Sequence, residues 1–210
     1  MLVFDFYAGT GSATQAFKDA GHTVISFELN PEQPATENVD ILTINAADLL
    51  ARYGRPDFVW ASPPCTTFSV ASIAKYWHYV DGVLTAKDEG VKLGIAMVKK
   101  AIELIDELQP IKGWIIENPR GMLRKQKFIQ ELHRRTVTYC QYGDFRQKPT
   151  DLWGNVINWI ERPPCKPGAP CHVAAPRGSS TGTQGLKITE RSMIPYSLGK
   201  EILEAIDVPI

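Results

Sequence analysis

The sequence lacks a long hydrophobic run. No apolar stretch in its 210 residues reaches ten residues, and the apolar start at residues 1–4 meets Asp5 at once. A membrane-spanning helix needs about 20 apolar residues, and a secretory signal carries basic residues ahead of its apolar segment. We therefore expect neither a membrane span nor a signal peptide, and we expect a cytoplasmic location.

Cysteine is scarce, with only Cys65, Cys140, Cys165 and Cys171 in the chain. Without an export signal, this number favours reduced thiols over a disulfide framework and leaves cysteine free for chemistry. Cys165, Cys171 and His172 could offer three zinc ligands, with Cys140 as a fourth, but their spacing matches no standard zinc knuckle. From the sequence we therefore assign no metal to the chain.

Net charge is also missing, because 23 basic side chains balance 23 acidic ones. A zero sum excludes the general basic excess of many polyanion-binding domains. The distribution is nevertheless uneven: residues 1–60 hold three basic and eight acidic side chains, whereas residues 110–150 hold nine basic and three acidic. Clustered, solvated helix faces would explain this pattern, and so would a local phosphate-binding surface.

Strand-like and helix-like segments alternate along the chain. Residues 2–7, 12–20 and 22–28 predict a strand, a glycine-containing turn into a helix, and a second strand, which together form a βαβ unit. Further parallel strands are predicted at residues 41–44, 57–61, 114–117 and 136–142. The sequence therefore predicts an α/β fold with a doubly wound, mostly parallel sheet and helices on both faces.

A long helix is predicted between Thr85 and Pro110, with Asp88 in its cap. A further helix is predicted at residues 194–206. Nine of the 24 residues at 162–185 are Pro or Gly, which indicates a loop rather than a second domain. We expect one catalytic domain, residues 1–210, in which 156–187 is a short loop excursion.

The first chemical motif is the glycine turn after the first strand, Asp5-Phe6-Tyr7-Ala8-Gly9-Thr10-Gly11-Ser12. Its glycines let the backbone approach a ligand, and Glu28, 17 residues after Gly11, can accept both hydroxyls of a ribose. The third glycine of the dinucleotide fingerprint is missing, which favours an adenosyl group such as S-adenosylmethionine. An NAD-dependent oxidoreductase, or a turn that serves packing alone, remains an alternative.

Two more motifs follow predicted strands. Pro63-Pro64-Cys65 comes after residues 57–61, and Glu117 ends residues 114–117. Ligands gather at the carboxyl ends of parallel strands, so these two side chains would open into one cleft if the strands are neighbours. Burial would then keep the Glu117 carboxyl protonated and able to donate. Otherwise, Cys65 is a small core residue and Glu117 pairs with Arg120.

In order and approximate spacing, these motifs resemble the cytosine carbon-5 DNA methyltransferase family. The resemblance rests on residues 5–11, on Pro64-Cys65 with Phe68-Ser69, and on Glu117-Asn118. It implies that Cys65 is the nucleophile, that Glu117 contacts the cytosine ring nitrogen-3, and that the cofactor is S-adenosylmethionine. The implied cofactor-binding residues are Phe6, Tyr7, Ala8, Gly9, Thr10, Gly11, Glu28 (ribose), Asp48 (adenine), Leu49, Pro63 and Ser197.

The chain departs from the family at the usual Gln-x-Arg-x-Arg segment. Counted from Tyr142-Gly143, the first arginine falls on Lys148 and the second on Thr150, so we assign the guanidinium near the cytosine oxygen, and hence the third catalytic role, to Arg146. Residues 156–187 are too short for the family's recognition domain, which predicts short or relaxed sequence specificity.

The resemblance implies DNA as the partner, with the target cytosine flipped out of the duplex and methylated as in restriction-modification. The basic residues expected to contact phosphates are Arg120, Arg124, Lys125, Lys127, Lys148, Arg134 and Arg135. Residues 69–83, just after the nucleophile, predict either a lid or an amphipathic packing helix.

Three alternatives stay open. The same chemistry could act on cytosine in RNA or in a free nucleotide, or the chain could be a catalytically silent nucleic-acid-binding subunit. A partner subunit could also supply sequence recognition.

Overall fold

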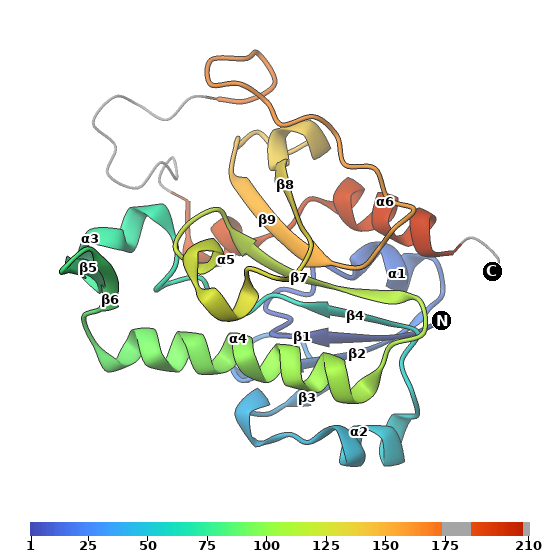
Figure 1. Cartoon of the computed structure of the whole chain (residues 1–210). Coiled ribbons are helices and arrows are strands. Elements are labelled where there is room, and N and C mark those ends of the chain that lie inside the picture. The colour runs from blue at the N-terminus through green and yellow to red at the C-terminus, as the bar shows by residue number, and fades with distance from the viewer. Residues whose placement is uncertain (174–185, 208–210) are drawn as a thin grey trace.

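The computed structural model describes residues 1–173 and 186–207 and has one seven-stranded sheet at its centre (Figure 1). The strand order is β3-β2-β1-β4-β7-β9-β8, in which β3 to β7 are parallel neighbours and β9 runs antiparallel to both β7 and β8. This confirms the predicted doubly wound, mostly parallel sheet. The strands are β1 (Leu2–Phe6), β2 (Thr23–Glu28), β3 (Glu37–Asn38), β4 (Phe58–Ala61), β7 (Gly113–Pro119), β8 (Arg134–Thr138) and β9 (Pro149–Gly154).

Helices cover both faces of the sheet. Figure 1 shows α4 running across one face, while α1 and α6 lie side by side on the other. The α-helices are α1 (Gln15–Asp19), α2 (Ala46–Tyr53), α3 (Ile73–Tyr76), α4 (Glu89–Leu108), α5 (Ile188–Ser192) and α6 (Tyr196–Ile206). The short 3-10 helices are η1 (Ile41–Thr43), η2 (Val70–Ser72), η3 (Leu123–Lys125), η4 (Lys127–Ile129) and η5 (Tyr139–Tyr142).

Each face of the sheet has its own hydrophobic core. Phe4 and Phe6 of β1 face the core that contains Val98 of α4, whereas Val3 faces the core that contains Phe17 of α1 and Leu198 of α6. Successive side chains of a strand point to opposite faces, so a strand covered on both sides must be apolar throughout. This explains why the strands appear in the sequence as continuous apolar runs.

Two strand predictions were wrong in part. Residues 41–43 form η1 and Ile44 follows it, so there is no strand here, because the Asp40 side chain accepts a hydrogen bond of 3.0 Å from the Leu42 amide and starts a helical turn. The third strand along the chain is β3 instead, which ends at Asn38, three residues before the predicted strand begins. Residues 136–142 divide into the end of β8 and η5. β8 pairs in the antiparallel sense with β9, and the sequence pattern did not reveal β9 as a strand.

The segment after Cys65 is not a single packing helix. It contains η2, α3 and the first strand of a hairpin made of β5 (Trp77–Val80) and β6 (Val83–Ala86). Asp88 is itself the N-cap of α4, because its carboxylate accepts from the Val91 amide at 3.1 Å. The helix therefore starts after Asp88 rather than near Thr85. The possible role of the hairpin as a lid stays a prediction.

Other expectations concern the rest of the chain. All four cysteines are free thiols. In residues 1–173 and 186–207, no helix is long and apolar enough to cross a membrane. Residues 156–173 of the expected loop contain neither a helix nor a strand, and residues 174–185 lie outside the described part of the chain.

Candidate active site

Cys65 and Glu117 lie at the carboxyl ends of two adjacent parallel strands. Ala61 at the end of β4 pairs with Ile116 in β7, which brings the chain leading to Cys65 beside Glu117. The Glu117 side chain is buried, with the residue only 6% exposed, and Cys65 is half-buried. The structure therefore brings together the two residues that the sequence motifs singled out.

The loops that carry these residues are joined by two hydrogen bonds, one from a side chain and one from the backbone. The Asn118 side-chain amide donates to the carbonyl oxygen of Pro63 at 2.9 Å, and the Met122 amide donates to the carbonyl oxygen of Phe68 at 2.7 Å. A Cβ on Gly121 would lie 2.0 Å from that same carbonyl oxygen, so only glycine fits there. These contacts fix Cys65 relative to Glu117.

Glu117 lies in an environment that favours its protonated form. Burial raises the pKa of the Glu117 carboxyl, and the Asp151 carboxylate adds to the rise, while Lys148 and a hydrogen bond from Tyr139 oppose it. That hydrogen bond runs from the Tyr139 hydroxyl to Glu117 Oε1 at 2.8 Å. Tyr139 is fully buried and thus holds the carboxyl in one orientation.

Lys148 is the cation whose charge acts on both Cys65 and Glu117. Burial lowers the pKa of the Lys148 ammonium, although Glu117 and Cys65 oppose this. Its Nζ donates to the Arg191 carbonyl oxygen at 3.0 Å and lies 4.6 Å from the centre of the Tyr139 ring. Burial and the Glu117 charge raise the pKa of the Cys65 thiol, and Lys148 lowers it.

Arg146 was assigned to the cytosine oxygen, and the structure gives its guanidinium other partners. It forms an ion pair with Asp144 and donates to the carbonyl oxygens of Glu190 at 2.8 Å and Met193 at 3.3 Å. The residue is buried, and these bonds hold it against α5 and the segment that follows α5. Lys148, where the first family arginine falls, therefore supplies the positive charge that reaches both Cys65 and Glu117.

The glycine turn borders open space at the end of β1. Tyr7, Gly9 and Gly11 have φ of 59°, 52° and 73°, the left-handed conformation that favours glycine. A Cβ built on Gly9 would meet no described protein atom within 4 Å. The Gly9 amide donates to Glu28 Oε2 at 2.8 Å, which connects the turn to the carboxylate that ends β2. The Asn30 amide donates to Glu28 Oε1 at 3.0 Å, so each carboxylate oxygen accepts one hydrogen bond and has a second lone pair for a further donor.

Asp5 lies fully buried beneath this turn. The Thr14 hydroxyl donates to its Oδ2 at 2.6 Å, while Oδ1 has no hydrogen-bond partner among the described residues. Burial raises the pKa of the Asp5 carboxyl from 3.8 to about 7. A buried oxygen without a partner at the cofactor turn is a polar group that a bound ligand or water can satisfy.

Asp48, which was expected at the adenine, and its neighbour Leu49, also expected to bind the cofactor, are not equally placed for contact. Asp48 is exposed in the first turn of α2, where it accepts from the Asn45 side chain at 2.6 Å, and Leu49 is fully buried in the core. Asp40, two residues after the end of β3, is close enough to the glycine turn for its charge to act on Tyr7: burial and then the Asp40 charge raise the pKa of the Tyr7 hydroxyl. The sequence reasoning missed Asp40, because the short strand before it is polar.

Ser197 lies near the glycine turn. Its hydroxyl donates to the Tyr142 carbonyl oxygen, and it lines a cavity of about 570 Å³ together with Ile194 and Pro195. The Ile194 amide donates to Ser12 Oγ at 3.0 Å, which joins this cavity's wall to the end of the turn.

Lys148, one of the basic residues predicted to contact phosphates, lies instead where its charge acts on Cys65 and Glu117. The other predicted residues divide into two groups. Arg120, Lys125, Lys127 and Arg134 are exposed. Arg124 instead makes a two-pronged ion pair with the buried Asp151, with a distance of 2.8 Å from Nε to Oδ2.

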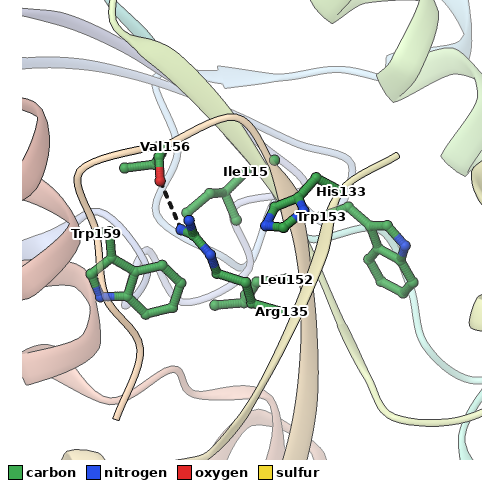
Figure 2. Close-up of a pocket in the computed structure, with 8 residues that line it drawn as sticks. Ile115, His133, Arg135, Leu152, Trp153, Val156 and Trp159 are labelled. Atoms are coloured by element: carbon green, nitrogen blue, oxygen red, sulfur yellow. Dashed lines mark hydrogen bonds between the residues drawn. The ribbon is translucent and has the colours of Figure 1, made fainter. Parts of the chain in front are cut away.

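Arg135 also makes its contacts within the protein. Figure 2 shows its guanidinium bonded to the Val156 carbonyl oxygen, at 2.7 Å, beside Trp159. The cavity there, about 10 Å³, has room for no more than a water molecule. The phosphate contacts expected of Arg124 and Arg135 are therefore corrected to structural contacts.

Comparison with known proteins adds two relatives. The chain is 29% identical to "Probable DNA (cytosine-5)-methyltransferase" of Frog virus 3 (isolate Goorha), over 97% of this chain and 99% of that protein. It is 30% identical to "Type II methyltransferase M.AplI" of Arthrospira platensis over 64% of this chain, but spans only 37% of that relative's length. No family model matches the chain.

Among solved structures, Spodoptera frugiperda DNMT2, in a mutant form, matches with a TM-score of 0.49 and 14% identity, over 73% of this chain and 49% of that one. S. pombe Dnmt2 matches with a TM-score of 0.47 and 13% identity, again over 73% and 49%.

The sheet order, the glycine turn after β1 and the acidic residue that ends β2 define a Rossmann-like fold. The viral relative named "Probable DNA (cytosine-5)-methyltransferase" is similar to this chain over nearly the full length of both.

Proposed function

We propose that this protein transfers a methyl group from S-adenosylmethionine to carbon-5 of cytosine in DNA, through a covalent adduct with Cys65. The observation that carries the proposal is the placement of Cys65 and Glu117 at neighbouring strand ends, under the common charge of Lys148. The relative from Frog virus 3, whose name gives this activity as probable, matches 97% of this chain and supports the proposal.

Cytosine carbon-5 is a poor nucleophile until the ring accepts electrons from elsewhere. In the proposed reaction, the Cys65 thiolate adds to carbon-6 and makes carbon-5 electron-rich. Glu117 donates a proton or a strong hydrogen bond to ring nitrogen-3, which draws electron density from the ring as Cys65 attacks. S-adenosylmethionine supplies the electrophilic methyl group when bound. Loss of the carbon-5 proton to a base then expels Cys65.

The proton on Glu117 serves both partners. Because the ionised Glu117 carboxylate raises the pKa of the Cys65 thiol, a protonated Glu117 makes the thiolate easier to form. The same proton is the one that nitrogen-3 needs. Lys148 offsets the negative charge that remains on the thiolate. We therefore assign Lys148 the electrostatic role that the sequence had suggested for Arg146.

The residues present fit an S-adenosyl cofactor. The space beside Gly9 lets a ligand approach the backbone, and Glu28 at the end of β2 can accept ribose hydroxyls. Asp40 is proposed for the adenine edge in place of Asp48. Ser197, at the cavity joined to the turn through Ser12, stays a candidate contact.

The proposed DNA surface consists of exposed cations that follow Glu117 along the chain. Phosphates would bind Arg120, Lys125, Lys127 and Arg134, which lie after β7 and at the start of β8. A flipped cytosine would enter the cleft between Cys65 and Glu117. The described part of the segment after β9, residues 156–173, contains no helix or strand, so we expect short or relaxed sequence specificity.

Mass spectrometry of nucleosides tests the proposal. Duplex DNA, RNA and a free cytosine nucleotide are each incubated with the protein and S-adenosylmethionine, beside the Cys65→Ser variant as the control. We expect 5-methylcytosine in DNA with the wild type and none with the variant. Product only in RNA or in the nucleotide would change the substrate, and no product in any of them would favour a silent binding subunit.

Mapping the methylated positions in DNA measures sequence specificity. Methylation at one long site alone would contradict the expectation of short or relaxed specificity.

A further inference from the structure

Three cysteines and a histidine outside the active site converge on one point. Cys140 lies in η5, and the other three residues follow β9, in the segment where the family usually has its recognition domain. One possible ligand atom from each residue lies within 4.8 Å of the other three. The residues are Cys140, Cys165, Cys171 and His172.

The spacings within this cluster are those of ligands around a zinc ion. Zinc bonds of about 2.3 Å to sulfur and about 2.0 Å to nitrogen, at the tetrahedral angle, put two sulfurs about 3.8 Å apart and a sulfur and a nitrogen about 3.6 Å apart. Here Cys171 Sγ lies 3.7 Å from Cys140 Sγ. His172 Nδ1 lies 3.3 Å from Cys165 Sγ and 3.7 Å from Cys171 Sγ. One ion fits between these atoms with little movement.

The surroundings of the cluster also suit thiolate ligands. The side-chain amide of Gln141 donates to Cys171 Sγ at 3.3 Å, and that of Gln147 donates to Cys165 Sγ at 3.4 Å. Hydrogen bonds to metal-bound sulfur orient the ligands and stabilise their charge. The Cys165 amide in turn donates to the Thr138 hydroxyl at 2.9 Å, which fixes the start of the segment at the end of β8.

We propose that Cys140, Cys165, Cys171 and His172 bind one zinc ion in a closed structural site. Three thiolates and one imidazole fill a tetrahedral shell and leave no open position for a substrate, so the ion stabilises structure rather than performing catalysis. The site goes beyond the methyl transfer proposed above and does not depend on it. The sequence did not predict it, because the ligand spacing matches no standard knuckle.

The ion would fasten residues 165–172 to η5. A segment this short, without a helix or strand of its own, buries too little apolar surface to hold one conformation unaided, and metal binding supplies free energy of folding in such cases. Gln147, next to Lys148, also donates to the Cys165 carbonyl oxygen at 3.1 Å. The zinc site would therefore fix the segment close to the catalytic chain.

Elemental analysis of the full-length protein tests the proposal. The protein is purified without chelators and then dialysed against metal-free buffer. We expect about one zinc ion per chain in the wild type. The Cys165→Ser and Cys171→Ser variants should retain a small fraction of that amount, whereas Cys65→Ser, which removes a cysteine outside the cluster, should retain the full amount. Zinc that is lost equally from Cys65→Ser would overturn the assignment.

A second measurement covers the case in which the variants fail to fold. Cobalt(II) is added to the metal-free wild-type protein, and the absorption spectrum is recorded. Tetrahedral coordination by three thiolates predicts strong sulfur-to-cobalt charge-transfer bands and intense visible bands, both removed by one equivalent of zinc. Folded wild-type protein that contains no zinc and gives none of these bands would contradict the proposal.

Discussion

The Asn118 side chain donates a buried hydrogen bond of 2.9 Å to the carbonyl oxygen of Pro63, two residues before Cys65. It joins the end of β7 to the turn that carries the proposed nucleophile. The distance between Cys65 and Glu117 therefore depends on a residue that is neither acid nor nucleophile.

Replacing Asn118 with Ala should lower kcat by at least about tenfold, because a small displacement of reacting groups is costly. It should also lower the free energy of unfolding by about 1–3 kcal/mol, as expected for a lost buried hydrogen bond. Steady-state kinetics and urea unfolding measure the two effects. The matched control is Asn155→Ala, since Asn155 accepts from the Trp114 amide at the other end of β7 at 2.9 Å. If both variants lowered kcat equally, the positioning role would be wrong.

The charges around Cys65 predict opposite effects on its reactivity. Glu117→Gln removes the negative charge that raises the pKa of the thiol, so the rate of alkylation by iodoacetamide should rise at lower pH than in the wild type. Lys148→Met removes the opposing positive charge and should shift that profile to higher pH. We expect each shift to be about one pH unit. Both variants should lose methylation activity. Identical alkylation profiles in all three proteins would show that these charges do not act on Cys65.

The buried Asp5 predicts that the free energy of unfolding falls as the pH rises from about 4 to about 7. Its pKa is about 7 in the folded protein against 3.8 ordinarily, so the folded state holds a proton that the unfolded state releases in this range. The stabilisation is complete below pH 4 and is lost as the pH rises through 7, and a shift of this size corresponds to about 4 kcal/mol. Asp5→Asn should therefore flatten the pH dependence of the free energy of unfolding. An unchanged slope in the variant would contradict the assignment to Asp5.

The cofactor contacts can be separated by calorimetry with S-adenosylhomocysteine. Glu28→Gln and Asp40→Asn should each weaken binding by about tenfold or more, which corresponds to about 1.4 kcal/mol. Asp48→Asn should bind nearly as well as the wild type, because its carboxylate is bonded to Asn45 at the start of α2. The reverse result, with weakening at Asp48 alone, would restore the interpretation based on the sequence.

Local sequence patterns predicted the parts of the site that lie within single motifs. The glycine turn, Cys65 after a buried strand and Glu117 at the end of another could each be found, because a parallel sheet places ligands at the carboxyl ends of its strands. Which strands are neighbours had to be assumed. The pairing of β4 with β7 supplied that relationship.

The features that were missed depend on contacts between distant segments. β9 begins with a proline and buries Asp151 against Arg124, so it lacked the apolar pattern of a central strand. The Asp144 carboxylate forms an ion pair with Arg146 and holds it away from the role proposed for Lys148, and this contact could not be read from the sequence. The cysteine cluster joins two segments about 30 residues apart, and spacing along the chain does not reveal such a site.

Trapping with 5-fluorocytosine tests most directly whether Cys65 forms the covalent adduct. Fluorine at carbon-5 cannot leave as a proton, so a DNA duplex with this base should remain bonded to the enzyme after methyl transfer. With S-adenosylmethionine present, we predict a stable protein–DNA complex and a modified Cys65 in peptides mapped by mass spectrometry. Methylation of ordinary cytosine without any trapped complex, or a complex bonded to another residue, would contradict the account.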